Sequence, residues 1–133
     1  MNRQEIFNKA ISGIIQQKNP SIRDDHCCYR GMYGRKCAIG HLLSDTEYEP
    51  NMDDRDGMSV GQLRSNYGNL PLFNKLSNED AIFLRELQKL HDNTNIVTED
   101  NLSENFLTTF SRNAVAFAIK YNLNSDTCME KAP

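Results

Sequence analysis

Three stretches of the chain carry hydrophobic residues at the spacing of an α-helix. In residues 3–18 they form one stripe that ends before Asn19-Pro20, because the residue before a proline avoids the helical conformation. Residues 77–91 begin with the capping residue Ser77 and an acidic first turn, which favours a helix start. Residues 101–121 repeat large apolar side chains every three or four positions. Each predicted helix has one apolar face, and we expect the three faces to pack together.

Shorter elements are predicted between the long helices. Residues 37–43 and 60–66 each have the pattern of a short helix. Residues 31–34 have a glycine at each end and could form the loop of a β-hairpin, in which Cys28 would face Cys37. We expect residues 122–133 to be a flexible tail. The fold class is therefore mainly α, a single domain of three substantial helices plus short helices and at most one small β-hairpin.

Composition narrows the class of protein. The chain has 133 residues, enough for one domain. No segment reaches the roughly 18 consecutive apolar residues that a membrane span requires, and the N-terminus lacks the apolar core of a secretion signal. We therefore expect a cytoplasmic protein that does not associate with a membrane.

Charge is distributed unevenly along the chain. The net charge is only -3, but residues 1–43 hold seven basic and three acidic residues, whereas residues 44–60 hold six acidic and one basic. This balance argues against general DNA binding, which requires a strongly basic face. Local patches of either sign could still recognise a partner.

The four cysteines suggest three kinds of chemistry: a zinc site, a catalytic thiol, and a Cys28–Cys37 thiol pair that could form a disulfide or act as a redox switch. The simpler interpretation is buried packing in a reducing compartment. A zinc site could be built from four residues with tetrahedral ligand chemistry, namely His26, Cys28, Cys37 and His41. A thiol enzyme would use Cys37 as nucleophile, His91 as base and Asp92 to orient the imidazole. Adjacent positions on a helix point about 100° apart, so we expect Asp92 to be badly placed for that role.

A third hypothesis is a nucleotide or phosphate site. Arg23, Arg30, Arg35 and Lys36 could pair with phosphate, and Tyr29 and Tyr33 could stack on a base. The glycines at positions 31 and 34 are too close together for a phosphate-binding loop.

A series of short motifs resembles a known group of proteins. The motifs are Cys28-Tyr29-Arg30-Gly31, Cys37-Ala38-Ile39-Gly40, residues 42–48, and Leu87-Gln88-Lys89-Leu90-His91-Asp92. In this order, over residues 25–95, they are similar to small uncharacterised proteins encoded by phages and prophages. His41 departs from that pattern, in which a small residue or cysteine is common. The resemblance supplies no activity, but it implies a small intracellular accessory protein of a mobile element.

Taken together, these observations favour a non-enzymatic module that binds a host macromolecule as an inhibitor or regulator. The expected partner is a protein. Aromatic and arginine side chains are enriched at interface hot spots. The predicted binding residues are therefore those around the 31–34 loop, namely Tyr29, Arg30, Tyr33, Arg35 and Lys36. The alternatives are a thiol- or zinc-dependent enzyme centred on Cys28, Cys37 and His91, and a nucleotide- or phosphate-binding protein.

Overall fold

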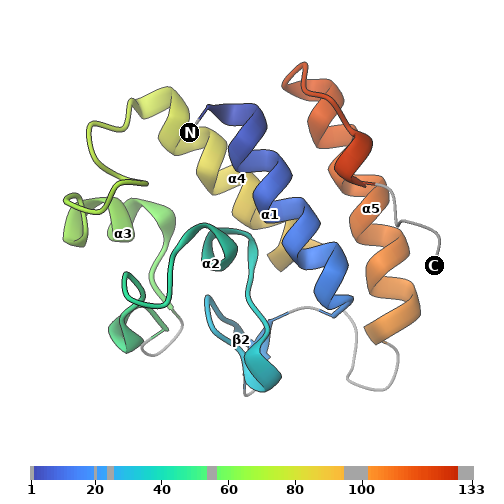
Figure 1. The fold of residues 1–133 in the computed structure, drawn as a ribbon, viewed down its shortest axis with the longest axis horizontal. Coiled ribbons are helices and arrows are strands. Elements are labelled where there is room, and N and C mark those ends of the chain that lie inside the picture. The colour runs from blue at the N-terminus through green and yellow to red at the C-terminus, as the bar shows by residue number, and fades with distance from the viewer. Residues whose placement is uncertain (1, 20, 24–25, 54–56, 95–101, 129–133) are drawn as a thin grey trace.

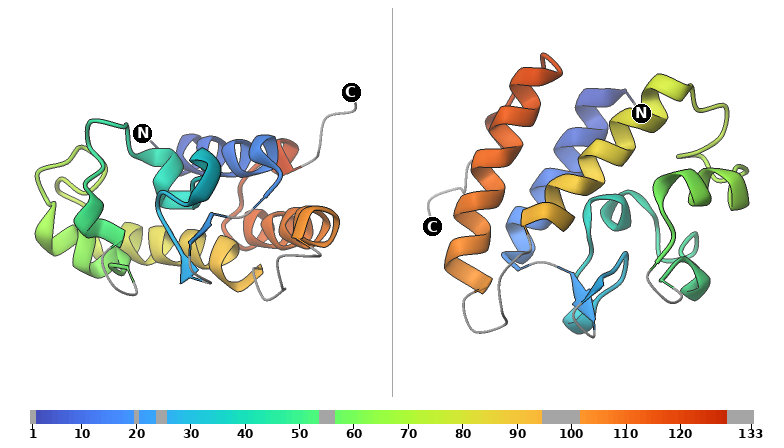
Figure 2. Two further views of the ribbon diagram at one scale, coloured as in Figure 1. Left: turned by 90° about the horizontal axis from the view of Figure 1, so that it is seen from below. Right: turned by 180° about the vertical axis from the view of Figure 1, so that it is seen from behind.

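The computed structural model describes residues 2–19, 21–23, 26–53, 57–94 and 102–128. Its three long helices are α1 (Arg3–Gln17), α4 (Asn78–Thr94) and α5 (Leu102–Lys120). The helices α4 and α5 pack against each other, and α1 lies on one side of that pair (Figures 1 and 2). The predicted mainly α, single-domain fold class is confirmed.

Helix α1 begins at a capping box. The side chain of Asn2 accepts a hydrogen bond from the backbone of Glu5, and the Glu5 carboxylate accepts one from the backbone of Asn2. The helix ends at Lys18, whose φ is 66°. It buries one face, made of Phe7, Ala10, Ile11, Ile14 and Ile15. The apolar stripe predicted for this segment is therefore the face that enters the core.

Aromatic rings join the three long helices. The ring of Phe117 stacks on Phe7 at a centroid distance of 5.7 Å and lies 5.4 Å from Phe83. A second pair, Phe106 and Phe110, stacks at 5.5 Å. Such pairs contribute about 0.5–1.5 kcal/mol beyond the area they bury, so the contacts of Phe117 with Phe7 and Phe83 help to hold α5 against α1 and α4.

The short helices are α2 (Ala38–Leu42) and α3 (Val60–Asn66). Helix α2 packs on α1 and α4, and α3 packs on α4. Helix α3 starts with a capping box between Ser59 and Gln62. The described residues also include three short 3-10 turns: η1 (Met32–Gly34), η2 (Pro50–Asp53) and η4 (Asp126–Cys128).

The predicted hairpin is in the wrong place. The two-stranded sheet pairs β1 (Ile22–Arg23) with β2 (His26–Cys27), antiparallel. Residues 28–30 and 35–37 are not strands. The geometry in which Cys28 faces Cys37 across a ladder is therefore not formed.

The end of the chain also differs from the expected flexible tail. Residues 122–128 fold back onto α1, and Cys128 is completely buried. The side chain of Gln4 on α1 bonds to the backbone of Asn124 in both directions, at 3.1 and 2.7 Å. Residues 129–133, the rest of the expected tail, lie outside the described residues.

No helix in the described part of the chain combines the length and the apolar character that crossing a membrane requires.

Candidate functional site

Residues 31–36 form a loop with an exposed tip at residues 32–34, and we call this loop the knuckle. The Gly31 amide donates to the Arg35 carbonyl at 2.9 Å, and the Arg35 amide donates to the Met32 carbonyl at 3.2 Å. Two consecutive residues take left-handed backbone conformations, Tyr33 with φ 60° and Gly34 with φ 72°. The chain thus reverses here, but the bonded pair is Gly31 with Arg35 rather than Arg30 with Arg35.

The tip of the knuckle exposes two large side chains. Tyr33 is 83% exposed and Met32 is 46% exposed. The guanidinium of Arg35 lies 5.2 Å from the centre of the Tyr33 ring, within the range of a cation–π contact. Of the predicted binding residues, Tyr33 and Arg35 therefore lie where a partner could reach them.

Tyr29 and Arg30 were predicted as surface anchors, and the structure corrects this. Tyr29 is only 5% exposed, and its hydroxyl donates to the carbonyl of Met58. Burial, with a further contribution from nearby acidic groups, raises the pKa of the Tyr29 hydroxyl far above its usual range. The tyrosine packs in the interior because its hydroxyl finds a backbone acceptor there.

Arg30 holds the C-terminal end of α2. Its guanidinium donates to the carbonyls of Gly40 at 2.6 Å and Leu43 at 2.9 Å, and it lies 4.9 Å from the centre of the Tyr48 ring. Carbonyls at the end of a helix have no partner within it, and a planar guanidinium can bond two of them. Arg30 therefore braces the base of the knuckle instead of contacting solvent.

Asp53 fixes the backbone that leads into the knuckle. One oxygen of its carboxylate accepts from the amide of Tyr29 at 2.8 Å. The other accepts from the amide of Arg30 at 3.0 Å and from the hydroxyl of Tyr48 at 2.6 Å. The sequence placed Asp53 only within an acidic stretch, and nothing local distinguished it from its acidic neighbours.

Gln17 and Lys36 fix the other side of the knuckle. The side chain of Gln17, at the end of α1, donates to the carbonyl of Lys36 at 2.6 Å and accepts from its amide at 3.0 Å. The ammonium of Lys36 lies 3.8 Å from the carboxylate of Asp45. Lys36 is thus held by its backbone and half-buried, while its charge faces the acidic segment.

The hypothetical catalytic residues do come together, but as a structural network. His91 is completely buried, and its Nε2 accepts from the amide of Ser21 at 2.8 Å. A backbone amide can only donate, so the ring proton lies on Nδ1 and is donated to Asp92 at 3.0 Å. The expectation that Asp92 could not orient the ring is therefore wrong. Nε2, the nitrogen that would act as a base, already accepts the hydrogen bond from the Ser21 amide.

Gln88 extends the same network to α2. Its amide group donates to the carboxylate of Asp92 at 3.2 Å, and its oxygen accepts from the amide of Ile39 at 3.0 Å. A buried polar network that is fully satisfied adds rigidity and specifies one packing arrangement. His91, Asp92 and Gln88 thus join α4 to the start of α2 and to Ser21.

The environment of Cys37 disfavours a reactive thiol. It is completely buried, and burial raises the pKa of its thiol far above the usual range, with further raising contributions from Asp92 and Asp53. The smaller opposing effects of bonds from Gly40 and Gln88 do not offset this. The thiolate required of a nucleophile is therefore strongly disfavoured.

The hypothetical zinc ligands are described only in part. The structure places no three His, Cys, Asp or Glu side chains of its described residues where they could hold a metal ion. His41 instead bonds to the oxygen of Gln17 at 3.0 Å, and burial followed by the charges of Lys36 and Arg30 lowers its pKa to about 4. Cys28 and Cys37 are both buried. The side chain of His26 lies outside the described part, so the complete four-residue set stays a hypothesis.

The rate at which the cysteine thiols react distinguishes a packing role of these residues from a catalytic one. In a Cys27→Ser variant, whose remaining cysteines Cys28, Cys37 and Cys128 are all buried, we expect no rapid reaction with a disulfide reagent near neutral pH. Burial also raises the pKa of Cys128 to about 11. Denaturant should release all three thiols. One equivalent reacting in the folded protein within seconds would contradict this and restore the thiol-enzyme alternative.

Comparisons with protein-family models, curated proteins and solved structures find no match for this chain. The similarity to phage and prophage proteins therefore stays a hypothesis, and a functional proposal must rest on geometry. The geometry offers an exposed tyrosine and arginine on a loop whose base is held by Asp53, Arg30 and Gln17.

Proposed function

We propose that this chain is a non-enzymatic module that binds a protein partner through the knuckle. The proposal is supported mainly by Tyr33, which is highly exposed and yet takes a left-handed backbone conformation. A bulky residue there costs roughly 1–3 kcal/mol, and such residues cluster at functional sites. Glycine would take the same conformation without that cost. A strained tyrosine at the tip is best accounted for by a role of its ring.

The surroundings of Tyr33 suit a binding anchor. Binding by a rigid loop loses less conformational entropy than binding by a flexible one. The base of the knuckle is held from three sides by the side chains of Asp53, Arg30 and Gln17. Tyrosine and arginine dominate many interface hot spots, and here Arg35 lies over the Tyr33 ring. The ring and the charge can therefore engage a partner as one preformed unit.

The similarity to phage and prophage proteins extends this proposal to a setting. The chain is then an accessory protein in the host cytoplasm, and its partner is a host protein that it inhibits or regulates. The acidic segment beside Lys36 offers a second surface of opposite charge next to the knuckle.

Replacing Tyr33 by glycine tests the proposal, because it separates folding from binding. We expect Tyr33→Gly to keep or raise the free energy of unfolding, by up to about 1 kcal/mol, since the left-handed strain is relieved. Partner binding should fall at least ten-fold, because hot-spot truncations commonly cost about 2 kcal/mol or more. Quantitative mass spectrometry identifies proteins captured by the wild type and lost by the variant, and calorimetry with the purified candidate gives the affinity.

The matched control is Ile119→Ala, which shortens another exposed large side chain, 75% exposed on α5. It should leave capture unchanged. If Tyr33→Gly folds normally and captures the same proteins at the same levels as Ile119→Ala, the knuckle is not the binding site. Arg35→Gln provides a second variant, expected to weaken the same interaction.

A further inference from the structure

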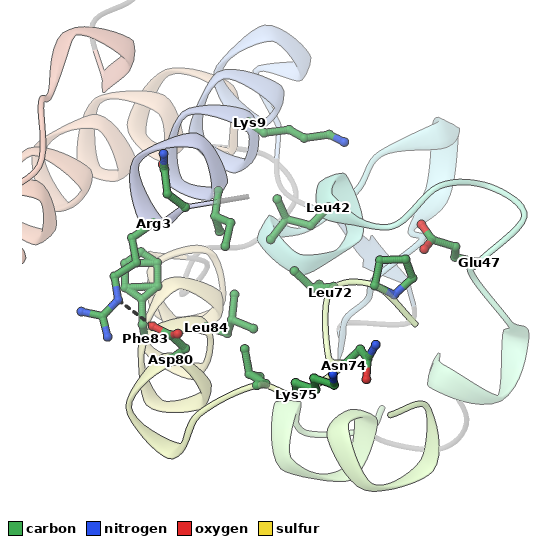
Figure 3. A pocket seen from close by; sticks show the side chains of 14 residues that line it. Arg3, Lys9, Leu42, Glu47, Leu72, Asn74, Lys75, Asp80, Phe83 and Leu84 are labelled. Atoms are coloured by element: carbon green, nitrogen blue, oxygen red, sulfur yellow. Dashed lines mark hydrogen bonds and ion pairs between the residues drawn. The ribbon is translucent and has the colours of Figure 1, made fainter. Parts of the chain in front are cut away.

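A cleft of about 550 Å³ lies beside the N-terminal half of α1, away from the knuckle. Its walls come from α1, α2, the beginning of α4 and residues 71–76, so that it is enclosed on several sides (Figure 3). The knuckle is bonded to the opposite end of α1, at Gln17. The volume lies within the range of about 300–1,000 Å³ typical of small-molecule sites.

The lining of the cleft is half polar and half apolar, and we call its aliphatic part the floor. The floor consists of Ile6 from α1, Leu42 from α2, Leu84 from α4 and Leu72 from the connecting segment. Leu42 and Leu84 are buried in the core, whereas Ile6 and Leu72 are half-buried and pack against it. Binding of an aliphatic ligand on this floor would bury apolar surface of both the ligand and the protein. Each Å² buried in this way stabilises the complex by about 25 cal/mol.

The lining carries three cations, Arg3, Lys9 and Lys75, and two carboxylates, Glu47 and Asp80, and this net charge of +1 favours an anion. At one end Arg3 is neutralised by Asp80 at 2.8 Å and lies over the ring of Phe83. Glu47, at another side, accepts a hydrogen bond from the amide of Ser44 at 2.8 Å.

Lys9 and Lys75 stand on opposite walls (Figure 3). Neither ammonium is within ion-pair distance of a carboxylate of the residues that the structure describes. Two unpaired cations therefore flank the apolar floor.

We propose that this cleft binds an aliphatic carboxylate. The hydrocarbon chain lies on the leucine and isoleucine floor, and the carboxylate pairs with Lys9 or Lys75 at the rim. Both lysines reach the rim on flexible stems that can themselves cover apolar surface. This site is separate from the knuckle and does not depend on the proposed function.

Three probes with the same ten-carbon chain distinguish charge from simple apolar binding: decanoate, decanol and decyltrimethylammonium. We expect calorimetry on the full chain to show decanoate binding tighter than decanol, and the cation binding weakest. Lys9→Gln and Lys75→Gln should each weaken decanoate binding about three-fold, and together about ten-fold, as expected for exposed ion pairs. Lys18→Gln, an exposed lysine outside the cleft, is the matched control and should change nothing.

Charge reversal provides a second readout. Lys75→Glu should shift the preference from decanoate toward decyltrimethylammonium, and thermal unfolding confirms that each variant is folded. Equal binding of all three probes, no binding of decanoate, or a double lysine variant that binds as the wild type would each overturn the proposal.

Discussion

Replacing Gly40 by alanine should destabilise the protein more than any other single methyl addition in its short helices. Gly40 lies buried in the middle of α2, and a Cβ there would overlap the carbonyl oxygen of Tyr29. That atom belongs to the backbone, so it cannot move aside as a flexible side chain would. Moving it would also disturb the Arg30 bond to the Gly40 carbonyl. We expect a loss of about 3 kcal/mol in the free energy of unfolding, at the upper end of overpacking effects.

Gly61→Ala is the matched control, since Gly61 is also a helical glycine, in α3. A Cβ there meets only the Ser59 hydroxyl, at an ordinary 3.8 Å. Alanine stabilises an exposed helix position by up to about 1 kcal/mol relative to glycine. Urea unfolding of both variants should therefore move in opposite directions. Equal stability of Gly40→Ala and the wild type would mean that Tyr29 and α2 are not in contact as described.

Asp53→Ala should destabilise the protein by an amount similar to that of Gly40→Ala. It removes a carboxylate that accepts from the amides of Tyr29 and Arg30 and from the hydroxyl of Tyr48. Hydrogen bonds to a charged group contribute about 1.5–3 kcal/mol each, and donors left without a partner add a penalty. Water can replace some of these hydrogen bonds at a half-buried site, so we expect the free energy of unfolding to fall by about 3 kcal/mol. Amide hydrogen exchange at Tyr29 and Arg30 should accelerate at the same time.

Asp45→Ala serves as the control from the same acidic segment. Asp45 is 88% exposed and contacts Arg30 and Lys36 only at 3.4 and 3.8 Å. Exposed pairs of this kind contribute little, so stability and exchange should stay close to the wild type. If the two aspartate variants behave alike, Asp53 does not fix the base of the knuckle.

The Gly40→Ala and Asp53→Ala variants also test the proposed function. The knuckle presents Tyr33 in one orientation because Asp53 and the contact between Gly40 and Tyr29 hold the chain on which it stands. Asp53→Ala should therefore weaken partner binding even at a temperature where the protein is fully folded. A loop that loses its support must be ordered again when the partner binds.

The long helices could be predicted from the chain because their signals are local. The apolar stripe from Ile6 to Ile15 has the helical period, and Pro20 follows its end. Residues 60–66, predicted as a short helix, form α3 with the same bounds. Periodicity, caps and breakers act over a few residues, so no knowledge of distant contacts was needed.

The hairpin prediction failed because its competitors lie far along the chain. The amides of Tyr29 and Arg30, one of which a two-stranded ladder would have used, are both bound by Asp53, more than 20 residues later. The side chain of Arg30 turns to the carbonyls at the end of α2. The glycines at positions 31 and 34 correctly indicated a chain reversal, but they did not determine which residues pair across it.

The same distinction between local and distant interactions applies to the candidate site. Residue type alone pointed to Tyr33 and Arg35 as binding residues and brought His91, Asp92 and Cys37 into one hypothesis. Only the packed structure separates the exposed Tyr33 from the buried Tyr29, because exposure depends on what covers a side chain.

The amino-acid order therefore specified the helices, the capped ends and the reversal at the knuckle, all of which follow from interactions between near neighbours. Tertiary contacts decided that His91 bonds to Ser21, that burial raises the pKa of the Cys37 thiol, and that Lys9 and Lys75 line one cleft. Burial, pKa and the pairing of charges depend on groups brought together from distant parts of the chain, and no local pattern encodes them.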